Sequence, residues 1–199
     1  MKRLFDIVFS LLFLLILSPV FLCVAFFIIM EERGPMLYQG VRVGRHGNLF
    51  RMLKFRTMVV NAEKLGGPST SDDDSRITRA GKLIRKYKLD ELPQLINVLI
   101  GEMSFVGPRP EVPMEVETYN DEEKRVLNVK PGITDYASLT FHNEGEILKG
   151  SSDPHQTYRE KLRPEKLRLA LKYVEKQSFW VDLKIIFDTI KTLVKTRTW

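Results

Sequence analysis

The sequence is poor in residues that form covalent cross-links or bind transition metals. Its 199 residues include a single cysteine, Cys23, so an intramolecular disulfide and a cysteine-based metal site are both excluded. The three histidines, His46, His142 and His155, are scattered and lack the spacing of a zinc site. No internal repeat or low-complexity tract is visible. A chain of this length is therefore expected to form one compact domain plus a membrane element.

Formal charge is absent from one long stretch near the start of the chain. The run from Ile7 to Met30 contains 24 residues without a charged side chain. As a straight helix it would be about 36 Å long, whereas a bilayer core of about 30 Å needs only about 20 residues. A cleaved signal peptide has a shorter apolar stretch and a small-residue cleavage site. We therefore expect the run to be retained as a membrane segment.

Two features of this run favour a re-entrant helix, although the residues alone leave a spanning helix open. Ser18-Pro19 lies in the middle, and proline kinks a helix because it has no N–H to donate. The Ser18 hydroxyl could satisfy the carbonyl group that the kink frees. Basic residues flank both ends, and the positive-inside rule places each group in the cytoplasm. They are Lys2 and Arg3 before the run, and Arg33, Arg42, Arg45, Arg51, Lys54 and Arg56 after it.

The rest of the chain has a net positive balance and predicts short elements joined by turns. The whole sequence carries a net charge of +6, which suits nucleic acid, an anionic membrane face or phosphorylated substrates. Apolar runs between glycines predict short strands over 36–60, and a stretch rich in glycine and aspartate predicts a mobile loop over 61–75. Apolar residues at helical spacing predict a helix over 90–100. A basic helix over 79–88, an acidic helix over 111–128 and a helix over 154–177 are also expected.

The last segment, 178–196, predicts an amphipathic helix. The pattern fits a helix that packs on the core. It also fits a helix that lies on a membrane surface with its lysines toward anionic headgroups. Trp180 and Trp199 suit a membrane interface. The apolar stripe consists of Phe179, Leu183, Ile186, Phe187, Ile190 and Leu193, with Lys184, Asp188, Lys191 and Lys195 on the other side.

Two adjacent carboxylates, Asp90 and Glu91, stand where a helix is expected to begin. Asp90 is a favourable N-cap and Glu91 complements the helix dipole, so a structural role explains both locally. The same place favours a phosphate, and Mg²⁺ would bridge a carboxylate to it. A carboxylate can also attack phosphorus and carry a covalent intermediate. Four cations lie just upstream, at Lys82, Arg85, Lys86 and Lys88.

Further cations occur in patterns that suit phosphate recognition. Arg109 stands between two prolines in Gly107-Pro108-Arg109-Pro110, and a rigidly held guanidinium can bind phosphate in bidentate fashion. Lys54 and Arg56 share one face if their segment is a strand. An exposed turn and a solvated strand face explain these residues equally well on local grounds. Asp72-Asp73-Asp74 lacks the adjoining apolar strand of a metal-binding aspartate motif and predicts a solvated loop.

Taken together, these segments resemble the bacterial sugar transferases of the monotopic phosphoglycosyl transferase family. The most specific part is Asp-Glu-Leu-Pro-Gln at 90–94, followed by Gly-Pro-Arg-Pro at 107–110. The N-terminal run with Ser18-Pro19 also looks like the family's, and the match covers most of the chain. The remaining blocks that carry the resemblance lie at 54–58, 76–81, 97–99, 101–106 and 130–134.

The resemblance implies an α+β, mostly helical fold. A re-entrant membrane helix is expected over 1–33, broken at Ser18-Pro19. A small cytoplasmic catalytic domain with amphipathic surface helices is expected over 34–199. The larger members of the family carry additional spanning helices ahead of this segment, and none is expected in this sequence.

The resemblance also implies a reaction at the cytoplasmic face of the bacterial cell membrane. Asp90 would attack the sugar-bearing phosphate of a UDP-sugar and expel UMP, and an undecaprenyl or similar polyprenyl phosphate would capture the phospho-sugar. Glu91 would support the metal or the incoming phosphate, and Mg²⁺ would be required, with Asp90 as its ligand. The product would start a capsule, exopolysaccharide, O-antigen or glycoprotein glycan. The phosphate-binding residues would be Lys54, Arg56, Arg85 and Arg109.

Partners and alternatives follow from the same residues. Anionic lipids of the inner leaflet are expected partners, and homo-oligomerisation is left open. A non-catalytic membrane-surface protein that binds nucleotide-sugar or anionic lipid is the main alternative, but it would not need the Asp90–Glu91 pair. Nucleic acid is not expected, because no aromatic stacking platform accompanies the cations.

The stretch 135–144 lacks an arginine that many family members have there, so the identity of the sugar stays open.

Overall fold

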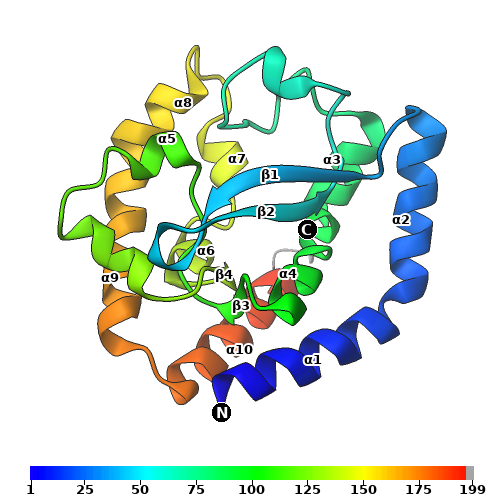
Figure 1. The fold of residues 1–199 in the computed structure, drawn as a ribbon. Helices are drawn as coiled ribbons and strands as arrows, with labels where there is room; N and C mark the ends of the chain where they lie inside the picture. Colours follow the sequence, from blue (N-terminus) through cyan, green and yellow to red (C-terminus); the bar gives the residue numbers. More distant parts are fainter. Residues whose placement is uncertain (196–199) are drawn as a thin grey trace.

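The fold of the chain is given by a computed structural model that describes residues 1–195. It is mostly helical with two small sheets, which confirms the predicted α+β class (Figure 1). Thr196 and Trp199, which belonged to the predicted C-terminal helix and its interface, lie outside the described residues. The α-helices are α1 Lys2–Ile16, α2 Ser18–Glu31, α3 Arg79–Lys86, α4 Gln94–Ile100, α5 Pro113–Val116, α6 Tyr136–Thr140, α7 Glu144–Ile147, α8 Pro154–Thr157, α9 Arg163–Lys176 and α10 Phe179–Lys195. The strands are β1 Leu37–Val43, β2 Leu49–Phe55, β3 Ser104–Val106 and β4 Gly132–Thr134.

The N-terminal apolar run forms α1 and α2, which meet at Leu17 with a bend of 61°. Pro19 lies in the first turn of α2, where a missing N–H is tolerated, and the Ser18 hydroxyl donates to the carbonyl of Leu15 at 2.8 Å. Within residues 1–195 no single helix has the length and apolarity to cross a membrane, but the bent pair does by length and composition alone. In Figure 1 the pair borders the molecule below and on the right.

Polar side chains near the start of α1 fasten this helix to the rest of the fold. Lys2 Nζ donates to Asp182 Oδ2 at 2.6 Å and to the Val106 carbonyl at 2.8 Å. The buried Asp6 carboxylate accepts hydrogen bonds from β3. Arg3 donates to the Val98 and Leu99 carbonyls in the last turn of α4. The helix thus contacts three separate elements of the domain.

The opposite end of the pair is fastened to the same body. Val24 and Ile28 of α2 pack against Phe55 and Ile84. The Glu31 carboxylate at the end of α2 accepts two backbone N–H bonds from the first turn of α3, each 2.7 Å long. The outward faces of both helices remain apolar and exposed. The most exposed large apolar side chains of α1 and α2 are Leu4, Leu15, Ile16, Leu22, Phe26, Phe27 and Met30.

A β-hairpin crosses the centre of the molecule and has the predicted position. β1 and β2 pair antiparallel from Leu37 opposite Phe55 to Val43 opposite Leu49. The amide of Asn97 joins the hairpin to α4, because it donates to the Arg51 carbonyl at 2.9 Å and accepts from the Leu53 N–H at 3.0 Å. β3 and β4 form a second, parallel pair that the sequence did not predict.

Several predicted helices are shorter or interrupted. The segment 90–100 is divided into a 3₁₀ turn, Leu89–Glu91, and α4, and Asp90 makes no side-chain cap. The expected helix over 111–128 is reduced to α5 and a 3₁₀ segment, Glu123–Asn128. By contrast, 154–177 is nearly continuous, since a π turn at Tyr158–Leu162 links α8 to α9.

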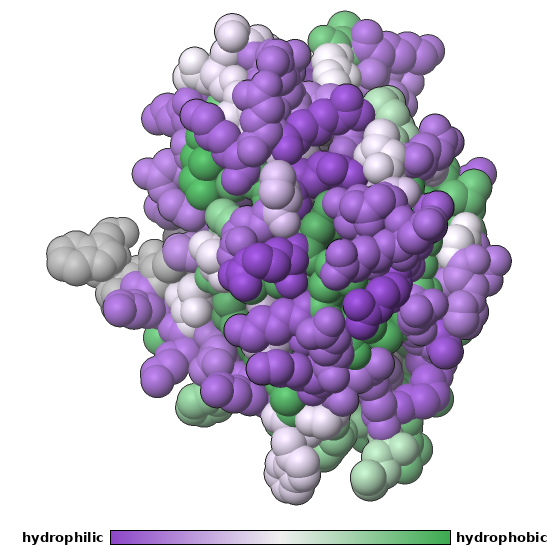
Figure 2. Space-filling view, turned by 90° about the vertical axis from the view of Figure 1, so that its left-hand side faces the viewer, coloured by the Kyte–Doolittle hydropathy of each residue, from purple (hydrophilic) through white to green (hydrophobic). Residues whose placement is uncertain are grey.

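The C-terminal helix α10 both packs on the core and exposes apolar residues. Val181, Ile185 and Ile186 pack against β3 and α9 residues. Ile185, outside the predicted stripe, is the buried core residue, and Ile186 is partly buried, whereas Phe187 and Ile190 of the stripe are exposed. Trp180 is also exposed. The face that carries α9, opposite α2, is covered mostly by hydrophilic residues (Figure 2).

Gly81 in α3 lies very close to the backbone that follows β2. A Cβ at Gly81 would lie 2.0 Å from the Thr57 carbonyl oxygen. Alanine normally stabilises a helix relative to glycine, but we expect Gly81→Ala to lower the free energy of unfolding by about 1–3 kcal/mol, because α3 must move away. Thermal unfolding of the purified protein measures this. Gly67→Ala is the matched control, since its Cβ would meet only His155 Cβ at 3.7 Å. A more stable Gly81→Ala protein would contradict the packing described.

Candidate active site

A cavity of about 800 Å³ opens between the β-hairpin, the loop after β2, α3 and the segments around Arg109 and Glu144. Charged side chains of both signs line it. Among the predicted site residues, Lys54, Arg85, Asp90, Glu91 and Arg109 all border this one cavity. The fold therefore brings together residues from a strand, a helix, a 3₁₀ turn and a proline-flanked loop.

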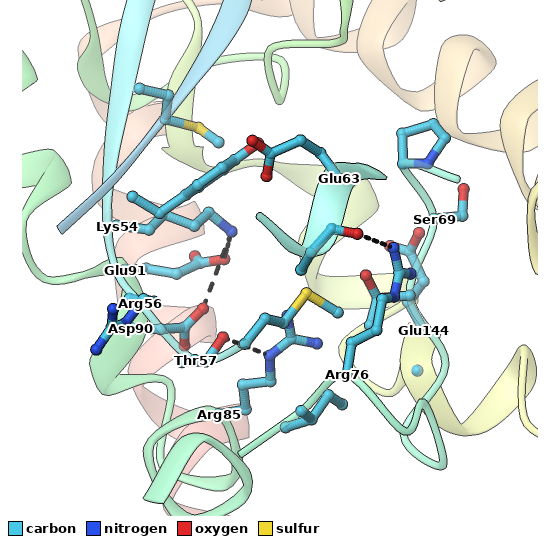
Figure 3. Close-up of a pocket in the computed structure, with 18 of the residues that line it drawn as sticks. Lys54, Arg56, Thr57, Glu63, Ser69, Arg76, Arg85, Asp90, Glu91 and Glu144 are labelled. Carbon is cyan, nitrogen blue, oxygen red and sulfur yellow. Dashed lines mark hydrogen bonds and ion pairs between the residues drawn. The ribbon is translucent and has the colours of Figure 1, made fainter. Parts of the chain in front are cut away.

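Glu91 is held between two cations. Lys54 Nζ lies 3.0 Å from Glu91 Oε1, and Arg109 bonds to both Glu91 oxygens, with an Nη1–Oε2 distance of 3.3 Å. The same lysine nitrogen lies 3.9 Å from Asp90 Oδ2 (Figure 3). Lys54 thus stands between the two carboxylates. Both oxygens of Glu91 bind cations at short distance, whereas Asp90 has only the longer ion pair of Oδ2 with Lys54.

Local backbone geometry explains how Asp90 reaches the cavity. α3 ends at Lys86, and Lys88 adopts a left-handed conformation with φ of 55°. This reversal turns the chain directly into the 3₁₀ turn that carries the two carboxylates. Arg85, in the last turn of α3, donates from Nε to Thr57 Oγ1 at 2.8 Å. The hydroxyl therefore holds one cation beside the start of the turn.

The two carboxylates have opposite electrostatic environments. Asp90 is 8% exposed, and its Oδ1 has no hydrogen-bond partner among the described residues. Burial raises the pKa of Asp90, and Lys54 opposes this effect. Burial also acts to raise the pKa of Glu91, but Arg109 and Lys54 together bring it well below the usual range. Glu91 is consequently a fixed anion, and Asp90 is a poorly solvated carboxylate that borders the cavity and has one buried oxygen without a partner in the described chain.

Arg56 is placed differently from the prediction. β2 ends at Phe55, so Lys54 and Arg56 do not share a strand face. The Arg56 guanidinium turns toward the end of α2 and donates from Nη2 to the Glu32 carbonyl. Arg56 borders the cavity, but its guanidinium group binds the end of α2.

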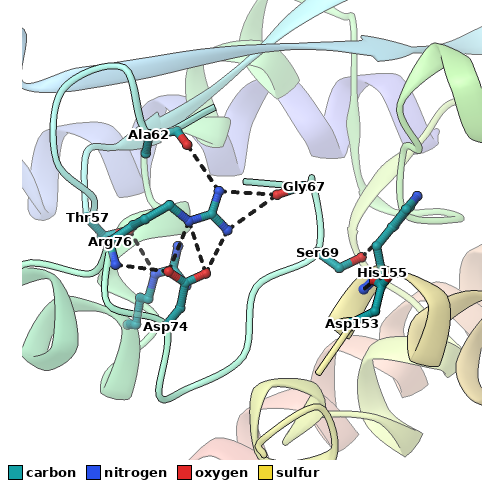
Figure 4. Close-up of polar contacts among 9 residues, drawn as sticks. Thr57, Ala62, Gly67, Ser69, Asp74, Arg76, Asp153 and His155 are labelled. Atoms are coloured by element: carbon teal, nitrogen blue, oxygen red, sulfur yellow. Dashed lines mark hydrogen bonds and ion pairs between the residues drawn. The ribbon is translucent and has the colours of Figure 1, made fainter. Parts of the chain in front are cut away.

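The predicted loop over 61–75 covers one side of the cavity and is tied down at both ends. Arg76 binds Asp74 through Nη2 at 2.6 Å and donates to the carbonyls of Ala62 and Gly67 (Figure 4). Ser69 Oγ lies 3.1 Å from His155 Nδ1 across the cavity. The Asp74 carboxylate therefore binds a neighbouring arginine and holds the loop in place. Over residues 1–195, histidine, cysteine, aspartate and glutamate side chains form no group of three or more suited to a metal ion.

The divergent stretch 135–144 is partly structural and partly exposed to the cavity. Asp135 caps α6, since its Oδ1 accepts the Ser138 N–H at 2.7 Å. His142 and Glu144 line the cavity, and Glu144 pairs with Lys166 at 2.7 Å. The end of this stretch therefore shapes the wall opposite the hairpin.

Three cavity residues were not selected from the sequence as site residues. Arg42 was noted only as a flanking cation, although it lies inside a predicted strand between two glycines. Glu111 and Tyr158, which form a hydrogen bond to each other across the cavity wall, carry no local pattern that marks them. Their proximity arises because the segment after Arg109 lies against the π turn between α8 and α9, and it could not be read from spacing.

Comparison with known proteins finds one family along nearly the whole chain. The family model described as bacterial sugar transferase matches residues 1–196. The chain is 35% identical to undecaprenyl-phosphate galactose phosphotransferase of Salmonella typhimurium, over 98% of this chain and 40% of the relative. It is 35% identical to UDP-glucose:undecaprenyl-phosphate glucose-1-phosphate transferase of Escherichia coli, over 96% of this chain and 39% of the relative. It is also 34% identical to the exopolysaccharide production protein ExoY of Sinorhizobium fredii, over 98% of this chain and 86% of the relative.

The first two of these relatives are much longer, and the chain spans about two-fifths of their length. The match nevertheless covers nearly all of this chain, including both carboxylates and the loop that carries Arg109. The resemblance identified from the sequence is therefore confirmed, and the protein belongs to the bacterial sugar transferase family.

Proposed function

We propose that the protein transfers a sugar 1-phosphate from a UDP-sugar to undecaprenyl phosphate or a similar polyprenyl phosphate, with release of UMP. The observation that carries this proposal is Asp90, a buried carboxylate with one unpartnered oxygen, which borders a cavity lined by lysine and arginine side chains. The names of the relatives support the acceptor, since several are undecaprenyl-phosphate sugar phosphotransferases. The name of one relative includes UDP-glucose, which supports the donor class. Such a product would begin the assembly of a surface glycan.

The reaction would proceed in two displacements at one phosphorus atom. An Asp90 oxygen attacks the sugar-bearing phosphorus, and the bond to the bridging oxygen breaks, so the oxygen and its electron pair leave with UMP. An oxygen of the lipid phosphate then attacks the same phosphorus. This second step breaks the acyl phosphate P–O bond to Asp90, returns its electron pair to the carboxylate and leaves a polyprenyl diphosphate sugar. The carboxylate is regenerated without a net proton change at Asp90.

The neighbouring cations would stabilise the charge that develops on the phosphate oxygens. Lys54 is shared between Asp90 and Glu91, and Arg109 is oriented by its two bonds to Glu91. Arg85 is held by Thr57, and its charge lowers the pKa of Asp90. Glu91 therefore acts as the anion that keeps Lys54 and Arg109 in place before substrate binds.

The residues present fit Mg²⁺, which we include in the proposal. Asp90 Oδ1 is buried and unpartnered, and carboxylate oxygens are the protein ligands that Mg²⁺ prefers. Mg²⁺ commonly uses one or two carboxylates together with substrate phosphates, so Asp90 with a diphosphate is a sufficient set. Glu91 would not be free to join, because both its oxygens bind cations. The ion would supply neutralisation of the diphosphate charge.

We also propose that residues 1–33 form a re-entrant membrane segment and that 34–199 form a catalytic domain at the cytoplasmic face. Both ends of the bent pair bond to the same globular body, through Lys2 at one end and Glu31 at the other. A spanning segment would separate its ends by about 30 Å of hydrocarbon. The exposed apolar faces of α1, α2 and α10 would lie in one leaflet, beside its anionic headgroups.

The first prediction of this proposal concerns Asp90. With polyprenyl phosphate and Mg²⁺ present, we expect lipid-dependent UMP release from one or two members of a UDP-sugar panel. Asp90→Asn should reduce it by about 10³-fold or more, because the nucleophile is lost. Without acceptor, intact-mass spectrometry should show a phospho-sugar adduct on the wild type only. The fully exposed Asp121→Asn is the control. Donor binding without turnover in the wild type would instead support a non-catalytic binding protein.

A second prediction concerns the pH dependence of the rate. Asp90 must be ionised to attack, so its raised pKa places the acidic limb of kcat/KM above that of an ordinary aspartate. Lys54 lowers the pKa of Asp90, and Lys54→Met should therefore move the limb to still higher pH. UMP release measured between about pH 4 and 8 tests this. The exposed Lys124→Met should leave the limb in place. A limb that stays or moves to lower pH in Lys54→Met contradicts the assignment.

A third prediction concerns the membrane segment. If the segment is re-entrant, an epitope attached ahead of Met1 stays on the same side as the catalytic domain. Protease added to spheroplasts should then leave this epitope intact until the membrane is permeabilised. An epitope attached after Trp199 serves as the control for the domain side. Digestion of the first epitope alone, in intact spheroplasts, would show a spanning helix.

A further inference from the structure

A row of cations lines the cavity beside the two carboxylates: Lys54, Arg109 and Arg42. Lys54 lies 3.9 Å from Asp90 and 3.0 Å from Glu91, which is bonded to Arg109. Within the described residues Arg42 forms no ion pair with either carboxylate, so it lies farther from Asp90 than Lys54 does.

The hairpin and the arginine loop hold Arg42 in this place. The N–H of Val43 donates to the carbonyl of Glu111 at 3.0 Å, so β1 is fixed to the segment that follows Arg109. The Arg42 side chain folds back over Gly40, where a Cβ would lie 3.0 Å from Arg42 Nη1 and 2.9 Å from Tyr38 Cε1. A side chain at position 40 would displace both groups. The backbone therefore leaves space for a guanidinium at the cavity wall.

Arg42 differs from the other cations of the row because no carboxylate pairs with it. Within the described part of the chain, Lys54 and Arg109 form ion pairs with Glu91, whereas Arg42 forms none. Its Nη1 donates to the neighbouring Val41 carbonyl at 2.8 Å. Burial lowers the pKa of Arg42, and the Tyr38 hydroxyl, which accepts its hydrogen bond, and the Glu111 carboxylate only partly oppose this. An anion bound beside Arg42 would therefore be stabilised by a charge that the protein itself leaves uncompensated.

The geometry of phosphoryl transfer shows which anion fits. In an in-line displacement the attacking oxygen, the phosphorus and the leaving oxygen are roughly collinear. The leaving nucleotide phosphate must then lie beyond the reacting phosphorus as seen from Asp90. A cation that binds it should line the cavity without pairing with Asp90 or Glu91, and Arg42 meets both conditions in the described chain. A guanidinium can contact two oxygens of one phosphate.

We propose that Arg42 binds the nucleotide phosphate that leaves as UMP. This inference rests on the proposed function and adds a donor-binding residue to it. When the bond between the sugar-bearing phosphorus and the bridging oxygen breaks, the electron pair goes to the nucleotide phosphate beside Arg42. Arg42 accordingly serves the first displacement. It has no role in the second, in which the lipid phosphate attacks after UMP has gone.

The test compares Arg42→Gln with Arg51→Gln, a matched change of an exposed arginine on the other strand of the same hairpin. Both variants are the full chain in the same detergent, and their thermal unfolding is recorded. For Arg42→Gln we expect kcat/KM for the UDP-sugar to fall about 10–100-fold, as for loss of a charged hydrogen bond. The inhibition constant of UMP should rise by a similar factor, and inhibition by uridine, which has no phosphate, should not change. Consumption of the preformed adduct by polyprenyl phosphate should keep its wild-type rate.

Each alternative outcome overturns the inference in a distinct way. An unchanged inhibition constant for UMP shows that Arg42 does not bind this phosphate. An equal loss for UMP and uridine shows contact with the nucleoside or a general distortion. A slower second displacement shows that Arg42 serves the acceptor phosphate. Calorimetric binding of UMP tests Arg42 even if the wild type shows no turnover, so a failure of the proposed function is distinguishable from a failure of this inference.

Discussion

The ion pairs of Glu91 with Lys54 and Arg109 are the constraint on which the site depends. They join a strand, a 3₁₀ turn and a proline-flanked loop through one carboxylate. They also give two adjacent acids different environments. Neighbouring groups whose pKa values differ can take different chemical roles. Glu91 stays ionised and committed to its cations. Asp90, one residue earlier, keeps an oxygen that nothing in the described chain satisfies.

The scaffold around these ion pairs is built from close backbone contacts rather than from a large core. Gly81 lets α3 approach the Thr57 carbonyl, and the Thr57 hydroxyl in turn orients Arg85. Gly107 approaches the Lys130 carbonyl so closely that a Cβ there would lie 2.2 Å away. Asn97 fixes α4 to the edge of the hairpin. Small residues and one amide therefore set the distances between the charged groups of the site.

The sequence predicted the parts of the fold that have local signals. Glycine-bounded apolar runs identified the hairpin, and Ser18-Pro19 indicated the bend that the structure has at Leu17. The parallel pair β3–β4 was missed, because each strand has three residues and no alternation can be seen over so short a run. The helix expected over 90–100 was too long, since Pro93 confines the regular part to residues after it.

Only part of the candidate site could be predicted from the sequence. Asp90, Glu91, Arg109 and Lys54 were found because their motifs are specific, and the structure gathers them in one cavity. Arg56 was expected on the face of Lys54, but the strand ends one residue before it. Arg42 had no motif, and only the hairpin pairing and the fold of the arginine loop bring it to the cavity. Local patterns thus identify reactive groups, whereas long-range packing decides which cations join them.

The double attachment of the N-terminal helices limits how this segment can vary in length. Each residue added to an α-helix advances its end by about 1.5 Å and rotates it by about 100°. A helix anchored at one end tolerates such a change, because its free end simply extends. Here Lys2 must meet Asp182 while Glu31 meets α3, so a single insertion in α1 or α2 would turn one anchor away from its partner. Insertions and deletions in this segment should therefore be tolerated only when compensated, in steps that restore the helical phase.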